Sequence, residues 1–314
     1  MTERDPARLH VRAGPWPRVE TISVPLSAGP PVTIGVAVPL HDNADVLEAT
    51  VDALLENLGP GDRIALVENG SRDGTHELAV RRYGAEPRIV IDRLTAGDAA
   101  VARNRAIELL GSVDFVAFCD GDDRWLPGRL GRVRAALAAT RADVLFQPLI
   151  ARTPLGAEVE GATFRTKSLP RGATLLEDLL VAGNFFSTSG LVLRRALLPL
   201  PLFADGLRRT QDYEAWCRFA AHHPHATVCY LDEPAADYRR GVAGLSADRW
   251  QRAANVFRIR RSYRQRLGMS ARIQLWGKRH LWLWAWSLRT GGNPLRALRV
   301  VLSHDDPRLF RGGR

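Results

Sequence analysis

Cysteine is scarce in this 314-residue sequence, which has only Cys119, Cys217 and Cys229. Each lies among apolar residues, and none has the CxxC or Cys/His spacing of a metal site. This pattern excludes a disulfide framework and a zinc–cysteine centre. We therefore expect three buried thiols in a reducing compartment.

Long hydrophobic runs are also absent. No apolar run reaches the roughly 18 residues that a membrane-spanning helix requires. The opening residues, MTERDPARLHVRAG, lack the apolar core of a secretory signal. We therefore expect a cytoplasmic protein.

Acidic residues are nearly absent from the C-terminal part of the chain. From Arg249 onward there are 16 Lys+Arg residues and only two acidic residues, Asp305 and Asp306, which gives a local charge of +14. The whole chain has a net charge of +10. The same part holds five of the eight tryptophans. Two roles stay open for residues 247–314: a helical extension that packs on the rest of the protein, or peripheral contact with the inner face of a membrane. No nucleic-acid-binding motif accompanies the charge, so we expect no specific nucleic acid binding.

Predicted strands and helices alternate at short spacing up to about residue 150. Such alternation is typical of a mostly parallel α/β sheet with helices on both faces. Beyond it the order is mixed, which suits an acceptor-binding half fused to the same sheet. We expect strands at 32–38, 64–67, 88–91, 115–119, 144–150, 189–193 and 227–231, and helices at 45–58, 73–83, 97–110, 127–139, 175–180 and 212–221. Pro39 should stop the first strand, and Asp45 can cap the first helix. The expected organisation is a leader or edge segment (1–31), one domain (32–246, with halves 32–150 and 151–246) and a mainly helical extension (247–314).

An acidic motif follows the apolar run at 115–119. Asp120 and Asp122 are two residues apart across Gly121, and they come where a buried parallel strand ends. Ligands of open α/β sheets bind at such ends, and hard carboxylate oxygens suit Mg²⁺ or Mn²⁺. The alternative is an acidic loop that caps the helix starting near Pro127.

Three more polar segments follow or precede predicted strands. His41, after the first strand, lies where a ring could meet a nucleobase, although a simple turn is the alternative. Glu68, after the second strand, could accept a hydrogen bond from a base or a ribose. Arg103 or Arg105 could reach a phosphate, for which arginine is well suited, or could simply be solvated.

Five segments in the order PLHDN, VENGSRDGT, ARNRA, FCDGDDRWLPGRL and TQDYEAWCRFA lie between residues 32 and 246. Together they resemble the family 2 inverting nucleotide-sugar glycosyltransferases, which have the GT-A fold, a Rossmann-like α/β architecture. The resemblance implies transfer of a sugar from a nucleoside-diphosphate sugar, most often UDP-linked, to an acceptor hydroxyl. It also implies that Pro39, His41 and Glu68 flank the nucleobase and ribose, with Arg103 on the donor side.

The resemblance also assigns the acidic residues. Asp120 would lie by the ribose and Asp122 would ligate a Mg²⁺ or Mn²⁺ ion on the diphosphate, both within a DxD motif. Asp212 would be the base that deprotonates the acceptor; read without the resemblance, it is equally a helix N-cap. The segment 184–190 resembles the stretch that approaches the donor sugar or the acceptor.

The sequence departs from the family pattern at a few positions. His41 stands where the family usually has tyrosine, and Gly241 stands where many relatives have a histidine that completes the metal shell. Metal binding would then be weaker, or water and phosphate alone would complete the shell. Two other functions stay open: a nucleotidyltransferase of related fold, which would release pyrophosphate, and a non-catalytic module that binds anionic surfaces through its basic tail.

Overall fold

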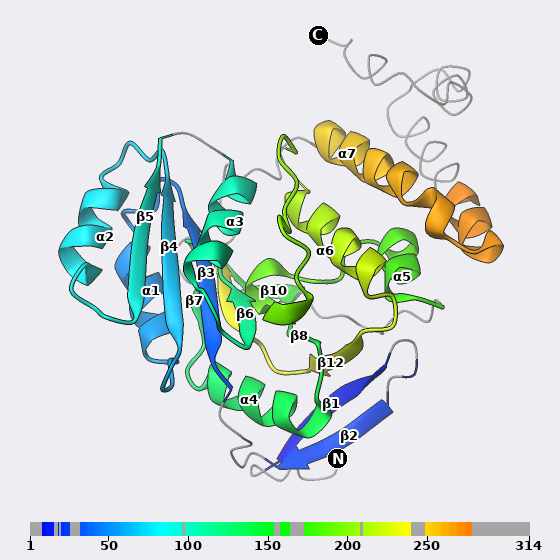
Figure 1. Ribbon diagram of the computed structural model, residues 1–314, viewed down its shortest axis with the longest axis horizontal. Coiled ribbons are helices and arrows are strands. Elements are labelled where there is room, and N and C mark those ends of the chain that lie inside the picture. The colour runs from blue at the N-terminus through cyan, green and yellow to red at the C-terminus, as the bar shows by residue number, and fades with distance from the viewer. Residues whose placement is uncertain are drawn as a thin grey trace.

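The computed structural model describes residues 8–15, 18, 20–25, 32–95, 98–153, 158–163, 173–207, 210–239 and 249–277. Within them, one central sheet runs in the order β2 (Glu20–Pro25), β1 (Arg8–Pro15), β12 (Thr227–Leu231), β8 (Val144–Phe146), β11 (Leu191–Arg194), β6 (Phe115–Phe118), β3 (Ile34–Leu40), β4 (Arg63–Asn69) and β5 (Ile89–Leu94) (Figure 1). The strands β6, β3, β4 and β5 are parallel to one another. The α/β architecture expected from the sequence is confirmed.

The other half of the sheet is mixed. Strand β11 is antiparallel to both β6 and β8, β12 is parallel to β8, and the hairpin of β1 and β2 adds to β12 at the edge. Strand β1 was not predicted, because its sequence, RLHVRAGP, is rich in polar residues and glycine.

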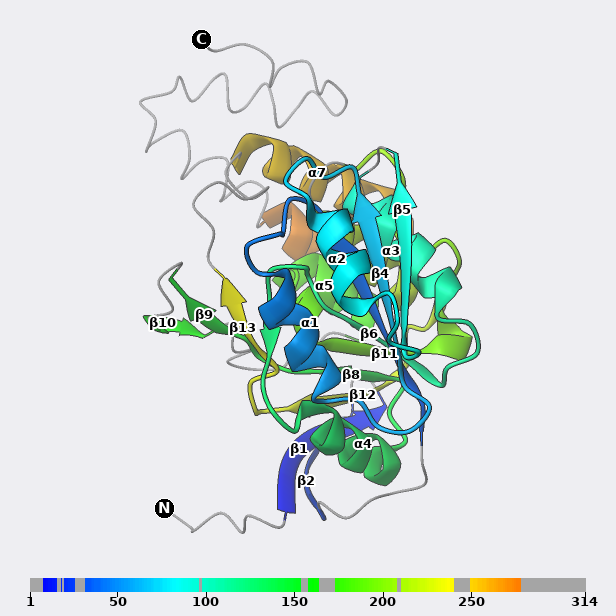
Figure 2. The same ribbon diagram turned by 90° about the vertical axis from the view of Figure 1, so that its left-hand side faces the viewer.

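A second sheet follows the order β10 (Glu158–Thr163), β9 (Ile150–Arg152), β13 (Ala236–Arg239) and β7 (Arg124–Trp125). Its strands β9, β10 and β13 project to one side of the central sheet (Figure 2). The single strand expected at 144–150 is therefore wrong: the chain leaves the central sheet after β8 and enters the second sheet at β9. A continuous apolar run does not reveal such a change of sheet.

Helices bury both faces of the central sheet. One face packs against α1 (Leu47–Leu55), α2 (Thr75–Tyr83) and α4 (Arg129–Thr140), and the other against α3 (Ala99–Leu109), α5 (Leu175–Ala182) and α6 (Gln211–His222). The three cysteines are buried, as expected. Since both faces are covered, polar chemistry is confined to the ends of the strands.

Two local expectations are wrong. The first strand, β3, does not stop at Pro39 but runs to Leu40. Its pairing with β6 ends at Ala37, whereas its pairing with β4 continues to Leu40. The missing N–H of Pro39 is tolerated because β3 has only one paired neighbour at this position. Asp45 does not cap α1, which begins at Leu47 after a turn in which the Asn43 carbonyl accepts from two backbone N–H groups. Asp45 instead forms an ion pair with Arg239 at 2.8 Å.

The C-terminal extension, as far as it is described, packs on the α5 and α6 side of the molecule. It contains α7 (Arg249–Ser262) and a further helical stretch at 269–277. The Tyr263 hydroxyl donates to Glu214 of α6 at 3.1 Å, and the Gly268 amide donates to Glu177 of α5 at 3.0 Å. The tryptophans at 282, 284 and 286 lie outside the described residues. Among the described helices, none has both the length and the apolar character needed to cross a bilayer.

Candidate active site

The acidic motif lies just beyond the end of β6, and its first carboxylate is fixed from two sides. The Arg103 guanidinium of α3 donates to Asp120 Oδ1 at 2.6 Å, and the Asp120 amide donates to Ser189 Oγ at 3.0 Å. Arg103 itself is 8% exposed. The arginine therefore orients Asp120 and neutralises part of the negative charge there.

Asp122 has an unusual protonation equilibrium. Burial and the nearby Asp120 carboxylate raise the pKa of Asp122 to about 6. The neighbouring Asp123 is buried and accepts a hydrogen bond from the Ser189 hydroxyl. Burial also raises the pKa of Asp123. The chain thus holds carboxylates at this point against their own repulsion, which is typical of a functional site.

Gly121 allows the motif to pack closely on the end of β3. A Cβ atom at this position would lie 2.6 Å from Asn43 Oδ1, 2.8 Å from the Pro39 carbonyl oxygen and 2.9 Å from Leu40 Cδ2. All three contacts are to groups of the loop at 41–46, which contains His41 (the His41 loop), or of β3, the strand before it. The absence of a side chain therefore brings the acidic motif and the His41 loop together.

We predict that Gly121→Ala lowers both stability and activity. The added Cβ forces the backbone of the acidic motif away from β3, which should cost about 1–3 kcal/mol of unfolding free energy. A shift of about 1 Å at reacting groups should lower the turnover rate by as much as about 10²-fold. Urea denaturation and turnover assays check both effects.

The matched control for this variant is Gly131→Ala. Gly131 lies in α4 and has nothing within 4 Å of its would-be Cβ. Alanine there should increase stability by about 0.5–1 kcal/mol and leave activity unchanged. Equal behaviour of the two variants would contradict the close-packing argument.

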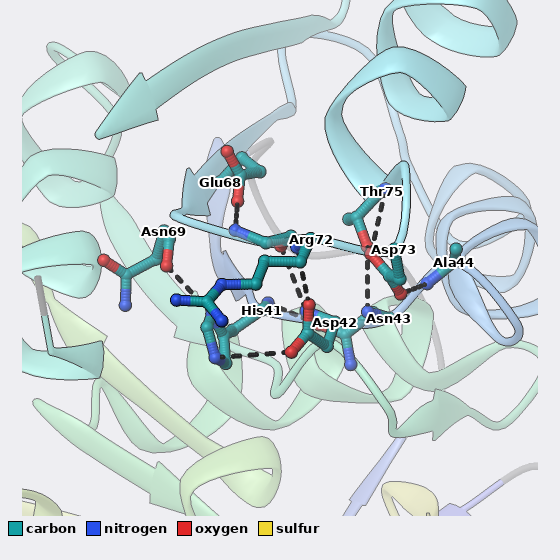
Figure 3. Close-up of polar contacts among 10 residues, drawn as sticks. His41, Asp42, Asn43, Ala44, Glu68, Asn69, Arg72, Asp73 and Thr75 are labelled. Carbon is teal, nitrogen blue, oxygen red and sulfur yellow. Dashed lines mark hydrogen bonds and ion pairs between the residues drawn. The ribbon is translucent and has the colours of Figure 1, made fainter. Parts of the chain in front are cut away.

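The loops after β3 and β4 are joined by a network of polar contacts (Figure 3). His41 Nδ1 lies 2.9 Å from the Asn69 carbonyl oxygen. Asp42 accepts from the Arg72 amide at 2.8 Å, and its own amide donates to Ser71 Oγ at 3.0 Å. The predicted nucleobase residue His41 is thereby held at the carboxyl ends of two parallel strands, beside Pro39, with its ring largely exposed.

Glu68 is buried and makes contacts within the protein that its predicted role in nucleotide binding does not require. The carboxylate is fully buried, accepts from the Ser71 amide, and pairs with Arg93 Nε at 3.1 Å. Arg93 is the β5 residue directly opposite Glu68 in the parallel register. Glu68 therefore fixes the loop at 69–71 from within. The hypothesis that Glu68 flanks the nucleobase and ribose stays a prediction. The nucleoside would then lie at the loop 69–71.

Asp73 also has a structural role, at the start of α2. Its carboxylate accepts from the Ala44 amide at 2.8 Å and from the Thr75 amide at 3.0 Å. Burial opposes ionisation, but the hydrogen bonds from Thr75 and Ala44 outweigh it and lower the pKa of Asp73. Asp73 therefore connects the loops after β3 and β4 as an ionised side chain.

Asp212 lies in the first turn of α6 and is not its N-cap. The capping position is Thr210, in left-handed backbone conformation and without a side-chain cap bond. The Asn184 side-chain amide donates to Asp212 Oδ2 at 2.9 Å. Asp212 is only partly buried. The capping alternative is therefore wrong, and the carboxylate is oriented by a residue of the segment 184–190.

That segment connects Asp212 with the acidic motif. Its two ends contact the two sites: Asn184 binds Asp212, and Ser189 binds Asp120 and Asp123. Five residues of extended chain span at most about 18 Å, so the contact to Asp212 and the contact to Asp120 lie near each other on one segment.

Aromatic packing fixes the same arrangement from below. The rings of Phe118 in β6 and Trp216 in α6 are 5.4 Å apart, and Phe203 lies 5.8 Å from Phe118 and 5.6 Å from Trp216. Phe118 is two residues before Asp120, and Trp216 is one helical turn after Asp212. The edge-to-face cluster therefore holds the two acidic elements in a fixed relation.

The donor set suits a divalent cation with few protein ligands. Among the described residues, no group of three or more His, Cys, Asp or Glu side chains has a metal-binding arrangement. Asp120 and Asp122 are two carboxylates whose repulsion a cation would offset. Mg²⁺ is commonly bound by one or two carboxylates together with substrate phosphates, so these residues fit such an ion. Gly241, the position of the missing histidine, lies outside the described residues.

Sequence reasoning missed two residues of this site. Arg93 lies beyond the strand predicted at 88–91, and only the register of the longer β5 pairs it with Glu68. Ser189 lies in a predicted strand, but the structure has a single helical turn there, with the hydroxyl between Asp120 and Asp123. The sequence likeness of 184–190 to the family stretch was the available signal.

Comparison with known proteins follows the same motifs. Residues 35–198, more than half of the chain, match the model of Glycosyl transferase family 2. The chain belongs to glycosyltransferase family 2. Among curated proteins, this glycosyltransferase is 24% identical over 233 residues to the putative teichuronic acid biosynthesis glycosyltransferase TuaG of Bacillus subtilis, covering 73% of this chain and 87% of TuaG.

Solved structures share the fold of this glycosyltransferase. S. aureus TarS 1–349 in complex with UDP-GlcNAc has a TM-score of 0.56 at 17% identity, with 80% of each chain covered. The mannosyltransferase PcManGT from Pyrobaculum calidifontis, in complex with GDP-Man and Mn²⁺, has a TM-score of 0.53 at 16% identity, with 91% of this chain and 84% of that chain covered. The central sheet and its helices are therefore a GT-A fold, and the predicted family and enzyme class are confirmed.

Proposed function

We propose that this enzyme is an inverting, metal-assisted glycosyltransferase that moves a sugar from a nucleoside-diphosphate sugar to an acceptor hydroxyl. The observation that carries the proposal is the link between the paired carboxylates and Asp212. The segment 184–190 contacts both, so a carboxylate would lie on each side of one reaction centre. One side has the donor set for a diphosphate, and the other has a candidate base.

The donor would lie across the carboxyl ends of β3, β4 and β6. Pro39 and His41 would border the nucleobase, with the loop that Glu68 fixes on the other side, while Asp120 would lie at the ribose with Arg103 orienting it. A UDP-linked sugar is the first candidate, because the TarS structure of similar fold holds UDP-GlcNAc. PcManGT, which holds GDP-Man, makes guanine the second.

Asp122, with Asp120, would hold the Mg²⁺ or Mn²⁺ ion. The ion would supply positive charge to the nucleoside diphosphate as it leaves. The resident side chains have separate tasks: Arg103 keeps Asp120 in place, and Ser189 ties the backbone of Asp120 to the buried Asp123. The carboxylates are therefore presented in advance of donor binding.

Asp212 would take the proton of the acceptor hydroxyl. As the acceptor oxygen forms its bond to the anomeric carbon, the bond from that carbon to the diphosphate oxygen breaks on the opposite face. The proton moves to the Asp212 carboxylate, whose orientation comes from Asn184. The product is a glycoside of inverted configuration plus a nucleoside diphosphate.

We predict that the enzyme releases a nucleoside diphosphate. A panel of nucleotide sugars, incubated with the enzyme and Mn²⁺ and analysed by ion-exchange chromatography and phosphorus NMR, checks this result. The donor that reacts fastest should release UDP or another nucleoside diphosphate. In a parallel incubation with a nucleoside triphosphate and a sugar 1-phosphate, release of pyrophosphate would instead identify a nucleotidyltransferase and overturn the proposal.

A further inference from the structure

The helical stretch at 269–277 has apolar side chains on two opposite faces. Ala271 and Leu275 pack against the core cluster of α6 and its neighbours. Met269 and Ile273 are 70% and 62% exposed, and Trp276 is 63% exposed. At 100° per residue, these last three side chains fall within an arc of about 60°, opposite the packed face. One apolar face is therefore used for packing, and the other is directed to solvent.

This exposed stripe stands out from the rest of the described surface. Large hydrophobic residues are strongly exposed at six described positions, and three of them belong to this stretch. The others lie apart from one another: Ile22 is in β2, Val80 is in α2 and Leu200 is in the loop after η2 (Arg195–Leu197). Single exposed hydrophobic residues are normal, whereas a cluster marks an interaction surface.

The charged residues of the segment that carries the stripe have one sign. Residues 249–277 contain eight arginines and no acidic residue. Arg258, Arg261, Arg264 and Arg266 are exposed on the elements that precede the stripe. Arginines beside an apolar stripe that includes tryptophan are typical of a helix that lies in the interface of an anionic bilayer.

The stripe is held in a fixed position relative to the active site. The Arg266 guanidinium donates to the Ala221 carbonyl at the end of α6 at 2.8 Å, and Tyr263 and Gly268 bind Glu214 and Glu177 as described. Figure 1 shows α7 alongside α5 and α6. A surface bound at the stripe would therefore be a fixed neighbour of α6, the helix that carries Asp212.

We propose that residues 258–276 form a docking face for an anionic lipid bilayer. Met269, Ile273 and Trp276 enter the interfacial region, and the arginines contact the headgroups. A soluble polyanion would engage the arginines but would leave the apolar stripe in water, so the stripe favours the bilayer. The inference goes beyond the transfer reaction and does not depend on the identity of the donor.

Vesicle cosedimentation of the full chain tests this face. Binding to phosphatidylglycerol vesicles is expected, with little binding to phosphatidylcholine and a decrease as salt is raised. The double variant Met269→Gln with Ile273→Gln should lower the partition coefficient about tenfold, because two apolar side chains no longer favour the interface. The matched control, Val80→Gln with Leu200→Gln, removes two exposed apolar side chains elsewhere and should bind like the native enzyme.

Circular dichroism melting of each variant tests whether the fold is retained. If the double variant does not fold, the single variants Met269→Gln and Ile273→Gln replace it. Each single variant is expected to lower binding about threefold. Absence of binding to phosphatidylglycerol vesicles would overturn the proposal. So would a double variant that binds as tightly as the native enzyme while inorganic polyphosphate displaces both, since that result identifies a polyanion site.

Discussion

Asp122→Asn is expected to abolish sugar transfer while making the folded protein more stable at pH 8. The variant keeps the shape of the side chain but removes the negative charge that would face the metal ion and the diphosphate. Loss of this electrostatic stabilisation should lower the turnover rate by about 10³-fold. Turnover with a fixed donor at saturating Mn²⁺ measures the loss.

The gain in stability follows from the raised pKa of Asp122. The fold disfavours the ionised carboxylate, since its pKa rises from 3.8 to about 6 through burial and the Asp120 charge. The stability that the protonated group provides is fully present below pH 3.8 and is lost as the pH rises through about 6. Asparagine stays neutral, so in the presence of a chelator the variant should gain on the order of 2 kcal/mol at pH 8, and the gain should shrink as the pH falls toward 4.

Asp73→Asn is the matched control, because its pKa is shifted in the opposite direction. Hydrogen bonds from Thr75 and Ala44 favour the ionised Asp73 carboxylate, so neutral asparagine should lower stability at pH 8. Urea denaturation at pH 8 and pH 5 measures both variants. An Asp122 variant with normal turnover, or one that is less stable at pH 8, would contradict the assignment of this carboxylate.

Much of the fold could be predicted because the local pattern and the tertiary environment agree. The runs at β3, β4 and β6 are buried on both faces, so their sequences are continuously apolar and β-branched. The strand expected at 227–231 matches β12 in its bounds. The antiparallel insertion of β11 could not be predicted, because strand direction depends on connections that periodicity does not encode.

The site divides in the same way. Asp120, Asp122 and Asp212 could be named as candidates because strand ends and family motifs mark them. The contacts of Asn184 with Asp212, of Ser189 with Asp120 and of Arg93 with Glu68 could not be predicted, because each joins residues that are distant in sequence. Such contacts depend on register and loop path, and a one-residue change of register would remove the Glu68–Arg93 pair.

A capping role fails for both Asp45 and Asp212, and for a common reason. An acidic residue at a predicted helix start is equally suited to capping and to chemistry. The structure gives both capping positions to other residues, Val46 and Thr210. Asp45 then pairs with Arg239, whereas Asp212 has the Asn184 amide at one oxygen. Only the contacts in the folded protein distinguish an acidic residue that caps a helix from one that has another role.

Asp212→Asn is expected to lower the turnover rate by about 10²–10⁴-fold with little change in donor binding. The amide has no basic oxygen to accept the acceptor proton, although its carbonyl oxygen can still accept the hydrogen bond from Asn184. The lost charge lies in the first turn of α6, where an anion is favourable, so stability should fall by only about 0.3–1 kcal/mol. Turnover, the donor KM and urea denaturation measure the three effects.

Two companion variants separate a chemical role of Asp212 from a structural one. Asn184→Ala removes the group that orients the carboxylate but leaves its charge, so turnover should fall by only about tenfold. Asp205→Asn changes an exposed acid in the loop before α6 and should leave turnover unchanged. If Asp212→Asn lost stability but retained turnover, the residue would act on the helix alone, and the base would have to be sought among other groups near the acidic motif. If turnover falls while the fold and donor binding persist, the remaining explanation is the missing proton acceptor.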